Sequence, residues 1–381
     1  MKDTSGAFLS EQESMIRASA RQVATEVVAA TAAERDRSGA WPREELKTVG
    51  ELGFLGMLVP EAHGGAGASF VEYCLAIEEF AAADAGFATL IHVHNSAGFM
   101  LARVGSEEQK GKYLSALASG ERIGAFLLTE PHAGSDTAAF RTTARRDGSH
   151  FVLNGSKQFI SNGSEAGLGL VLAVTDKAAG KNGSSLFIVD PAEPGYQVAR
   201  VEHKLGQRSA HVAQIQLDGC RVPPENIVGA EGEGYKMIMG SLAEGRVAIA
   251  AVAVGTARAA LEAALRYARE REAYGAPIAR LQGVSFDLAE MAMQVEVARQ
   301  YYLHAARLCE AGIPCAKEAS IAKLFASEMA EKVCSDALQI HGGYGYLQDF
   351  PVERYYRDVR VTKIYEGTSH IQKLIIAREL L

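Results

Sequence analysis

The hydrophobic period of this 381-residue chain changes twice, and this change constrains the fold more than any other feature. Up to about residue 121, apolar residues such as Met15, Ile16 and Ala20 recur at helical spacing. Between about 122 and 228 the apolar runs are short or alternating, as at 212–217, which is typical of strands. Long amphipathic helical runs then continue to the end. We therefore predict an α+β protein with three domains: an α-helical domain (1–121), a small antiparallel sheet or barrel (122–228) and a helical bundle of four helices (229–381).

Local signals predict where several elements begin or turn. Ser10-Glu11-Gln12-Glu13 and Ser106-Glu107-Glu108-Gln109 are capping boxes, which favour helix starts. Asp147-Gly148 and Asn154-Gly155 are hairpin signals between strand-like runs. We expect helices after the first two signals and tight turns at the other two.

Composition excludes several classes of protein. A net charge of −7 argues against nucleic acid or an anionic membrane as the main partner. The five cysteines are odd in number and lack C-x-x-C spacing, which favours reduced thiols over disulfides or a zinc site. The apolar stretch 247–254 is too short to span a bilayer, so we expect no membrane insertion. Because Met1-Lys2-Asp3-Thr4 leads into polar sequence, we expect no secretory signal and a cytoplasmic location.

Common nucleotide and hydrolase motifs are absent. The chain contains no G-x-G-x-x-G, G-x-x-x-x-G-K-[ST], H-E-x-x-H or G-x-S-x-G sequence. Rossmann dinucleotide binding, nucleotide hydrolysis, zinc peptidase and serine hydrolase functions are therefore unsupported. A flavin remains possible, because flavin sites share no single fingerprint.

Two segments of the strand-rich region could contact a flat ring. In 125–136 (Ala-Phe-Leu-Leu-Thr-Glu-Pro-His-Ala-Gly-Ser-Asp), small residues allow close backbone approach, and Thr129 and Ser135 can donate hydrogen bonds. In 153–162, Phe159 could stack on a ring and Ser161 could bond a ring heteroatom. The alternatives are a polar interdomain loop for the first segment and a hairpin with a core phenylalanine for the second.

Three segments of the C-terminal region carry further candidates. Arg271 in Arg-Glu-Ala-Tyr-Gly, with Gln282, could clamp a pyrophosphate, or could be a solvated helix end. The glycines of 339–346 (Gln-Ile-His-Gly-Gly-Tyr-Gly-Tyr) could present backbone N–H groups to a phosphate or adenine, or could cap a helix. Glu366 in Tyr-Glu-Gly-Thr could be a base before the last helix, or a surface acid.

Taken together and in this order, the five segments resemble the acyl-CoA dehydrogenase family, most closely its short-chain or butyryl-CoA type. The resemblance covers essentially the whole chain and is most specific at 351–358 and 364–372. It implies a helices–barrel–helices fold, FAD as cofactor, and oxidation of an acyl-CoA thioester to its trans-2-enoyl-CoA.

The resemblance assigns Glu366 as the base that takes the α-proton while the β-hydride passes to flavin N5. Backbone N–H of the base and a ribityl hydroxyl of FAD would stabilise the enolate-like charge. A water-poor pocket should raise the pKa of Glu366 and strengthen it as a base.

The resemblance also implies the remaining site residues. Flavin contacts would come from Phe126, Leu128, Thr129, Ser135, Phe159, Ser161, Thr368 and His370. The FAD pyrophosphate and adenosine would lie across a subunit interface on Arg271, Gln282, Gln339, Gly342 and Gly343. Substrate contacts would come from Ser135, Ala243, Arg246, Tyr365 and Gly367, and no metal is expected.

Some residues depart from the family pattern. Ala243 stands where many members carry Asp, and Glu244 is expected to be a poor substitute, since one helical residue turns a side chain by roughly 100°. His132 replaces a frequent Gly and His370 a frequent Gln. His132 is interpreted as a loop residue, and His92, His94 and His341 as packing or cap residues.

Several functions fit this resemblance. We expect a homotetramer, a dimer of dimers, that passes electrons to an electron-transferring flavoprotein. A flavin oxidase or monooxygenase using O2, and a non-catalytic scaffold, are the alternatives. Gly245 leaves no base on the nearby helix, and 87–98 resembles the short-chain subgroup, so a short straight or branched acyl group is favoured over a medium-chain or aromatic one. Fatty acid β-oxidation or amino-acid catabolism is the expected context.

Overall fold

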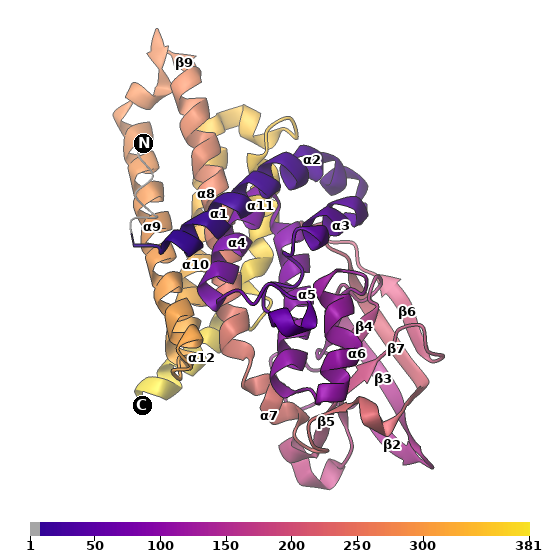
Figure 1. Ribbon diagram of the computed structural model, residues 1–381. Coiled ribbons are helices and arrows are strands. Elements are labelled where there is room, and N and C mark those ends of the chain that lie inside the picture. The colour runs from indigo at the N-terminus through magenta and orange to yellow at the C-terminus, as the bar shows by residue number, and fades with distance from the viewer. Residues whose placement is uncertain (1–7) are drawn as a thin grey trace.

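The computed structural model describes residues 8–381, so the first seven residues of the predicted N-terminal domain lie outside it. The predicted order of helices, strands and helices is confirmed (Figure 1). The N-terminal part contains α1 (Glu11–Val23), α2 (Ala29–Ser38), α3 (Arg43–Glu51), α4 (Phe70–Ala83), α5 (Ala85–Val104) and α6 (Glu107–Ala118).

Both predicted capping boxes begin helices. The Ser10 hydroxyl accepts a hydrogen bond from the Glu13 N–H while the Glu13 carboxylate accepts one from the Ser10 N–H, at the start of α1. Ser106 and Gln109 make the equivalent pair of bonds at α6. Each box satisfies backbone N–H groups that a helix start leaves unpaired.

The middle part is a sheet of mostly antiparallel strands, as predicted, with two parallel pairings that the prediction did not include. Strand β1 pairs in parallel with β4, and β2 also meets β4 in parallel, while the other neighbours are antiparallel. The order along the sheet is β6-β7-β3-β2-β4-β5-β8, with β1 beside β4. The strands are β1 (Gly124–Leu127), β2 (Thr143–Asp147), β3 (His150–Ser161), β4 (Leu168–Val174), β5 (Ser184–Val189), β6 (Tyr196–Val201), β7 (Val212–Val222) and β8 (Ile227–Val228).

One hairpin prediction is confirmed and the other is wrong. Asp147 pairs with His150 across the β2–β3 turn, where Gly148 takes a φ of +59°. Asn154-Gly155 instead lies inside β3, where the pairing with β7 shifts register. A Cβ at Gly155 would lie 2.4 Å from the Thr142 hydroxyl, so this glycine allows close chain approach and not a turn.

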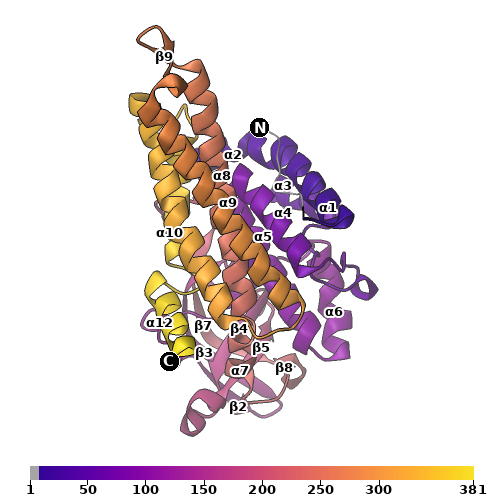
Figure 2. The same ribbon diagram turned by 90° about the vertical axis from the view of Figure 1, so that its left-hand side faces the viewer.

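The C-terminal part is a helical bundle. Figure 2 shows α8, α9 and α10 side by side, with the β9–β10 hairpin at their end away from the large sheet. The shorter α12 packs on α10. The elements are α7 (Gly234–Met239), α8 (Leu242–Glu270), β9 (Glu272–Ala273), β10 (Ala276–Pro277), α9 (Gln282–Glu310), α10 (Ala316–His341), α11 (Val352–Val359) and α12 (Ser369–Leu380).

Helix α8 joins the N-terminal and C-terminal parts. Its residues 247–254 are all buried in a core shared with α4, α5 and α10. Within residues 8–381, only the segment 234–270 is long and apolar enough to cross a membrane, and 61% of its most apolar window is buried inside the protein. Burial of this kind is expected of a core helix.

A second core explains how the sheet meets the helices. In β4, Leu168, Leu170 and Leu172 pack with Leu101 of α5 and Leu114 of α6. The alternate β4 residues face another cluster formed by β3, β5 and β7. The sheet is therefore held against α5, and the functional site forms near this junction.

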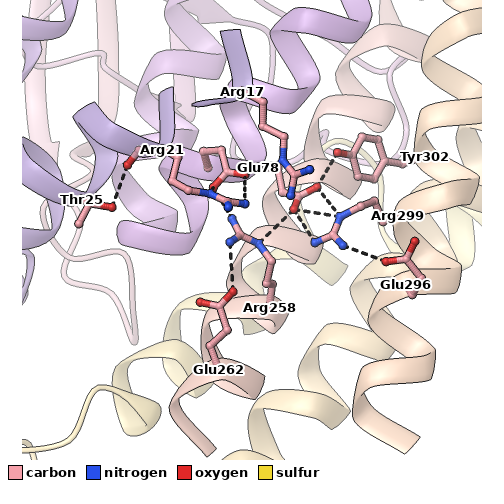
Figure 3. A network of polar contacts seen from close by, with 10 residues as sticks. Arg17, Arg21, Thr25, Glu78, Arg258, Glu262, Glu296, Arg299 and Tyr302 are labelled. Carbon is pink, nitrogen blue, oxygen red and sulfur yellow. Dashed lines mark hydrogen bonds and ion pairs between the residues drawn. The ribbon is translucent and has the colours of Figure 1, made fainter. Parts of the chain in front are cut away.

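A cluster of buried ions ties α4 to α8 and α9 (Figure 3). Glu78, on α4, accepts hydrogen bonds from Arg258 Nε at 3.1 Å and from Arg299 Nη2 at 2.7 Å. Tyr302 Oη donates to the other Glu78 oxygen at 2.6 Å. Both carboxylate oxygens of Glu78 therefore accept hydrogen bonds, and its charge is balanced by arginines, as a buried ion requires.

Candidate functional site

A cavity of about 270 Å³ lies where α4, α5 and α8 meet the large sheet and the segment 365–367. Its walls combine apolar side chains with a few polar groups, which is typical of small-molecule sites. Glu366 opens into this cavity, so its side chain keeps 30% exposure. The surface acid alternative for Glu366 is therefore less well supported than the role of a base in a pocket.

The Glu366 backbone is held in an uncommon conformation. Its φ of +52° is left-handed, which costs a non-glycine residue on the order of 1–3 kcal/mol unless the surroundings enforce it. Gln372 Nε2 donates to the Glu366 carbonyl at 3.0 Å and to the Gly367 carbonyl at 2.8 Å. Lys323 Nζ, fully buried on α10, also donates to the Gly367 carbonyl at 2.7 Å. These three bonds fix the segment that carries the carboxylate.

Helix α8 leaves room for this carboxylate at Gly245. A Cβ at this position would lie 2.8 Å from Glu366 Oε2 and 3.1 Å from its Cδ. The glycine therefore sets where the Glu366 side chain can lie.

Positive and hydrogen-bonding groups surround Glu366. His92 Nε2, from α5, lies 3.8 Å from Glu366 Oε1, which is too long for a full hydrogen bond. Burial raises the pKa of the Glu366 carboxyl, but the His92 ring and the charges of Arg246 and Lys323 outweigh burial and hold the pKa below its ordinary value. The expectation of a raised pKa is therefore wrong for the chain by itself, because these neighbours stabilise the ionised form.

The predicted flavin wall forms the sheet side of the same cavity. The lining residues from this wall are Phe126, Leu128, Thr129, Ser135, Phe159 and Ser161. Phe159 has a φ of +58° and keeps 65% of its surface exposed, so strained backbone presents an aromatic face outward. An exposed ring beside hydroxyl groups fits a flat, heteroatom-rich partner such as a flavin.

A buried ion pair supports this wall. Lys157 Nζ, on β3, donates to Glu130 Oε1 at 2.9 Å and to the Leu128 carbonyl at 3.1 Å. The Gln158 N–H donates to the Thr129 carbonyl at 2.8 Å. The 128–130 segment is thereby fixed to β3, and the hairpin alternative for 153–162 explains neither contact.

The predicted adenosine-side residues lie elsewhere in the chain. Arg271, Gly342 and Gly343 line a separate hollow with Tyr344, whose ring lies 5.6 Å from the Arg271 guanidinium carbon. Gln282 and Gln339 are exposed at the start of α9 and near the end of α10. None of these five residues lines the Glu366 cavity, so one chain does not bring the two sets together.

Two further predicted flavin contacts lie at the start of α12. The Thr368 hydroxyl caps this helix by accepting from the Ile371 N–H at 3.4 Å, and His370 is exposed. Neither is among the residues that line the cavity.

Most predicted substrate residues line the cavity, with one correction. Ser135, Arg246, Tyr365 and Gly367 do so, but Ala243 packs against the main core. Glu244 lines the cavity instead, with Oε1 2.8 Å from Arg103 Nη1. Glu244 is expected from the sequence to be a poor substitute, but the cavity meets α8 on the side of Glu244, Gly245 and Arg246.

Sequence reasoning missed several polar residues of the site. Tyr73, His92 and Glu244 line the cavity, and Lys323 holds the Glu366 segment. A usable signal existed for Lys323, since a lysine among Ala319, Ala322 and Ala326 falls on a buried helix face. Among residues 8–381, no group of three or more His, Cys, Asp or Glu side chains could hold a metal.

Comparisons with known proteins agree with this architecture. The chain matches the sequence profiles described as acyl-CoA dehydrogenase N-terminal domain over 10–121, middle domain over 125–220 and C-terminal domain over 232–381. It is 45% identical to an acyl-CoA dehydrogenase of Bacillus subtilis (98% of this chain, 99% of the relative). It is 42% identical to the short-chain specific acyl-CoA dehydrogenase of Mus musculus (98% and 91%). The solved structure of butyryl-CoA dehydrogenase from Megasphaera elsdenii superposes with a TM-score of 0.95 at 37% identity (98% of each chain).

Proposed function

We propose a reaction for this chain from its family, since the chain belongs to the acyl-CoA dehydrogenase family of FAD oxidoreductases. The proposed reaction is oxidation of a short-chain acyl-CoA to its trans-2-enoyl-CoA, with Glu366 as the base. One observation carries the proposal. The Glu366 carboxylate and the Phe126–Ser161 ring-accepting wall line one cavity, from opposite ends of the sequence. A base and a flat hydride acceptor are the two partners that removal of a proton and a hydride from adjacent carbons requires.

The residues of the wall fit FAD. Phe159 and the hydroxyls of Thr129, Ser135 and Ser161 would hold the isoalloxazine ring, which when bound accepts a hydride from the β carbon at N5. The protein's part in the reaction is to place the acyl chain between this wall and Glu366.

The proton step falls to Glu366. The ionised carboxylate would remove the α-proton, and its low pKa keeps it ionised before substrate arrives. The Glu366 N–H has no hydrogen-bond partner within residues 8–381, so it is free to donate to the thioester oxygen. A donor aimed at such a developing charge is worth roughly 3–4 kcal/mol in the transition state.

A short acyl chain is supported by the pocket and by the relatives. Leu58, Phe70 and Phe99 close the cavity with bulky side chains, and Gly245 carries no competing base. The mouse relative and the Megasphaera structure are named for short-chain and butyryl-CoA substrates. The straight or branched form of the chain follows from neither.

The assembly and its context extend the proposal. Because Arg271, Gln282, Gln339, Gly342 and Gly343 lie away from Glu366, they would hold the adenosine half of FAD bound to a neighbouring subunit in a homotetramer. Thr368 and His370 would face the same cofactor. An electron-transferring flavoprotein would accept the electrons in a cytoplasmic catabolic pathway such as β-oxidation. The three domains would be 1–121, 122–228 and 229–381.

Anaerobic flavin bleaching tests the proposal. FAD-loaded protein mixed with butyryl-CoA should lose its yellow colour, and Glu366→Gln should bind FAD but bleach at least about 10³-fold more slowly, since it lacks the base. Initial rates across a ladder of acyl-CoAs then define chain length. Normal reduction by the Gln variant would remove Glu366 from its assigned role, and rapid reoxidation of reduced protein by O2 would favour an oxidase.

A further inference from the structure

We infer that Tyr73 and His92 form a positioning pair that directs and holds the ionised Glu366 carboxylate. The inference rests on the proposed role of Glu366 as base and assigns His92 a function other than packing. It concerns three residues from α4, α5 and the 365–367 segment, which only the fold brings together.

The geometry forms a chain of three groups. Tyr73 Oη lies 3.0 Å from His92 Nδ1, and the opposite ring nitrogen, Nε2, lies 3.8 Å from Glu366 Oε1. Tyr73 and His92 are 1% and 2% exposed. His92 Nε2 has no hydrogen-bond partner within residues 8–381, although it is buried and faces the cavity. An unpaired buried nitrogen is costly unless a ligand or the carboxylate uses it.

The tyrosine determines which ring nitrogen carries the proton. Burial keeps the pKa of Tyr73 well above 10, so the phenol stays protonated. Within the described residues its hydroxyl has one hydrogen-bond partner, His92 Nδ1, so donation to this nitrogen is the arrangement that satisfies the buried O–H. A nitrogen that accepts cannot carry a proton, so this hydrogen bond selects the tautomer whose proton lies on Nε2 and points toward Glu366.

Other charged groups face the same carboxylate from each packed element. The charged groups are Arg246 from α8 and Lys323 from α10, and Arg378 of α12 acts on Arg246. The Tyr365 hydroxyl, which is uncharged, is a further titratable group near the carboxylate. Lys323 already donates to the Gly367 carbonyl. His92 Nε2 is the only Lys, Arg or His nitrogen within 4.0 Å of the carboxylate in residues 8–381.

Tyr73 and His92 therefore act on the Glu366 carboxylate before substrate binds. It keeps Glu366 ionised at lower pH than a buried carboxyl would otherwise allow, and it points one oxygen toward α5. The contact weakens once Glu366 takes a proton, because the N–H then faces a neutral group. His92 is accordingly a positioning residue whose effect appears in the acid limb of kcat/KM.

The pH profile of kcat/KM for the acyl-CoA tests this pair. His92→Phe should move the acid limb of kcat/KM upward by about one pH unit, because burial then acts on Glu366 with less opposition. His92→Gln, which keeps an N–H donor, should restore most of the shift, and Tyr73→Phe should give a smaller shift because the ring can change tautomer. Tyr302→Phe removes the hydroxyl that bonds Glu78 and should leave the limb unmoved.

Ring nitrogen NMR gives a readout that does not depend on turnover. The chain has ten histidines, so 15N-histidine labelling yields few ring signals. One signal set should show a protonated Nε2 and a bare Nδ1, vanish in His92→Gln and change in Tyr73→Phe. An acid limb that stays fixed in His92→Phe and His92→Gln, or a proton on Nδ1, overturns the inference. If Glu366→Gln is inactive in that case, the proposed function still stands.

Discussion

Two carboxylates, the buried Glu78 and the partly exposed Glu366, lie against the same helix, α8, but their surroundings differ. Glu78 accepts bonds from Arg258, Arg299 and Tyr302, all at 3.1 Å or less (Figure 3). The Glu366 carboxylate accepts no hydrogen bond within residues 8–381, and its closest cationic or histidine partner is 3.8 Å away. The hydrogen-bonding capacity of the Glu78 carboxylate is used by the protein itself, whereas the oxygens of Glu366 remain available to a substrate.

The unpaired groups around Glu366 strengthen this contrast. His92 Nε2, Glu244 Oε2 and Arg246 Nε are buried without hydrogen-bond partners in the described part of the chain, and all three residues line the cavity. No side-chain atom of Glu78, Arg258, Arg299 or Tyr302 is in that state. Unsatisfied polar atoms gathered at one cavity identify a functional site better than buried charge does.

Disrupting the ion cluster around Glu78, whose oxygens are all hydrogen-bonded, should have the largest effect on stability. Glu78→Gln removes the buried counter-ion that Arg258 and Arg299 share and leaves Arg299 with only the half-exposed Glu296, which should lower the free energy of unfolding by about 3–5 kcal/mol. Thermal and denaturant unfolding measure the loss, and turnover per folded FAD site should stay within about twofold, since this cluster lies outside the cavity. A stable variant with impaired turnover would contradict the comparison.

Alanine substitutions at two glycines of α8, Gly245 beside Glu366 and Gly255 beside Glu78, compare the two carboxylate sites directly. In Gly245→Ala the new methyl meets the end of the flexible Glu366 side chain, so the carboxylate should move and kcat fall by about 10²-fold with little loss of stability. In Gly255→Ala the methyl would lie 2.2 Å from the Glu78 backbone carbonyl, which cannot move independently of α4. That variant should lose about 1–3 kcal/mol of stability from overpacking.

Unfolding and single-turnover reduction measured on both variants separate the two roles. The first variant should fold and fail in catalysis, and the second should unfold more easily but turn over when folded. Equal losses of stability in both would show that Gly245 serves packing and not the placement of Glu366.

The smallest expected effect is on the pH dependence of stability. Burial raises the pKa of Glu78, but Arg299 and Arg258 outweigh burial and hold it well below the ordinary 4.5. Because the folded pKa lies below the unfolded one, Glu78 contributes stability that is present above pH 4.5 and lost as the pH falls. Between pH 5 and pH 3, the free energy of unfolding should fall less steeply in Glu78→Gln than in the natural protein. Identical slopes would contradict this role.

The sequence predicted the parts of the site that are local in the chain. The period change placed the sheet between helices, and Glu366, Phe126, Phe159 and Ser161 were found because short segments carry them. The Asn154-Gly155 dipeptide gave a wrong turn prediction. Its glycine is needed for close approach to Thr142, and the sequence does not distinguish this use from a turn.

The remaining features depend on distant contacts. Tyr73, His92 and Lys323 act on Glu366 from three helices, and no local pattern joins them. The low pKa of Glu366 follows from these neighbours, so burial alone predicted the wrong direction. Helical rotation predicted that Glu244 would be a poor substitute for an acid at position 243, but the cavity extends around α8 far enough to include it.

The role of Glu366 in proton removal is tested most directly by a single-turnover isotope effect. Butyryl-CoA deuterated at the α carbon is mixed without oxygen with FAD-loaded natural protein and with Glu366→Gln, and flavin bleaching is followed. We expect a primary isotope effect of roughly threefold or more in the natural protein, because removal of the α-proton limits the step, and no measurable reduction in the variant. Equal rates with both isotopes together with normal bleaching by Glu366→Gln would contradict it.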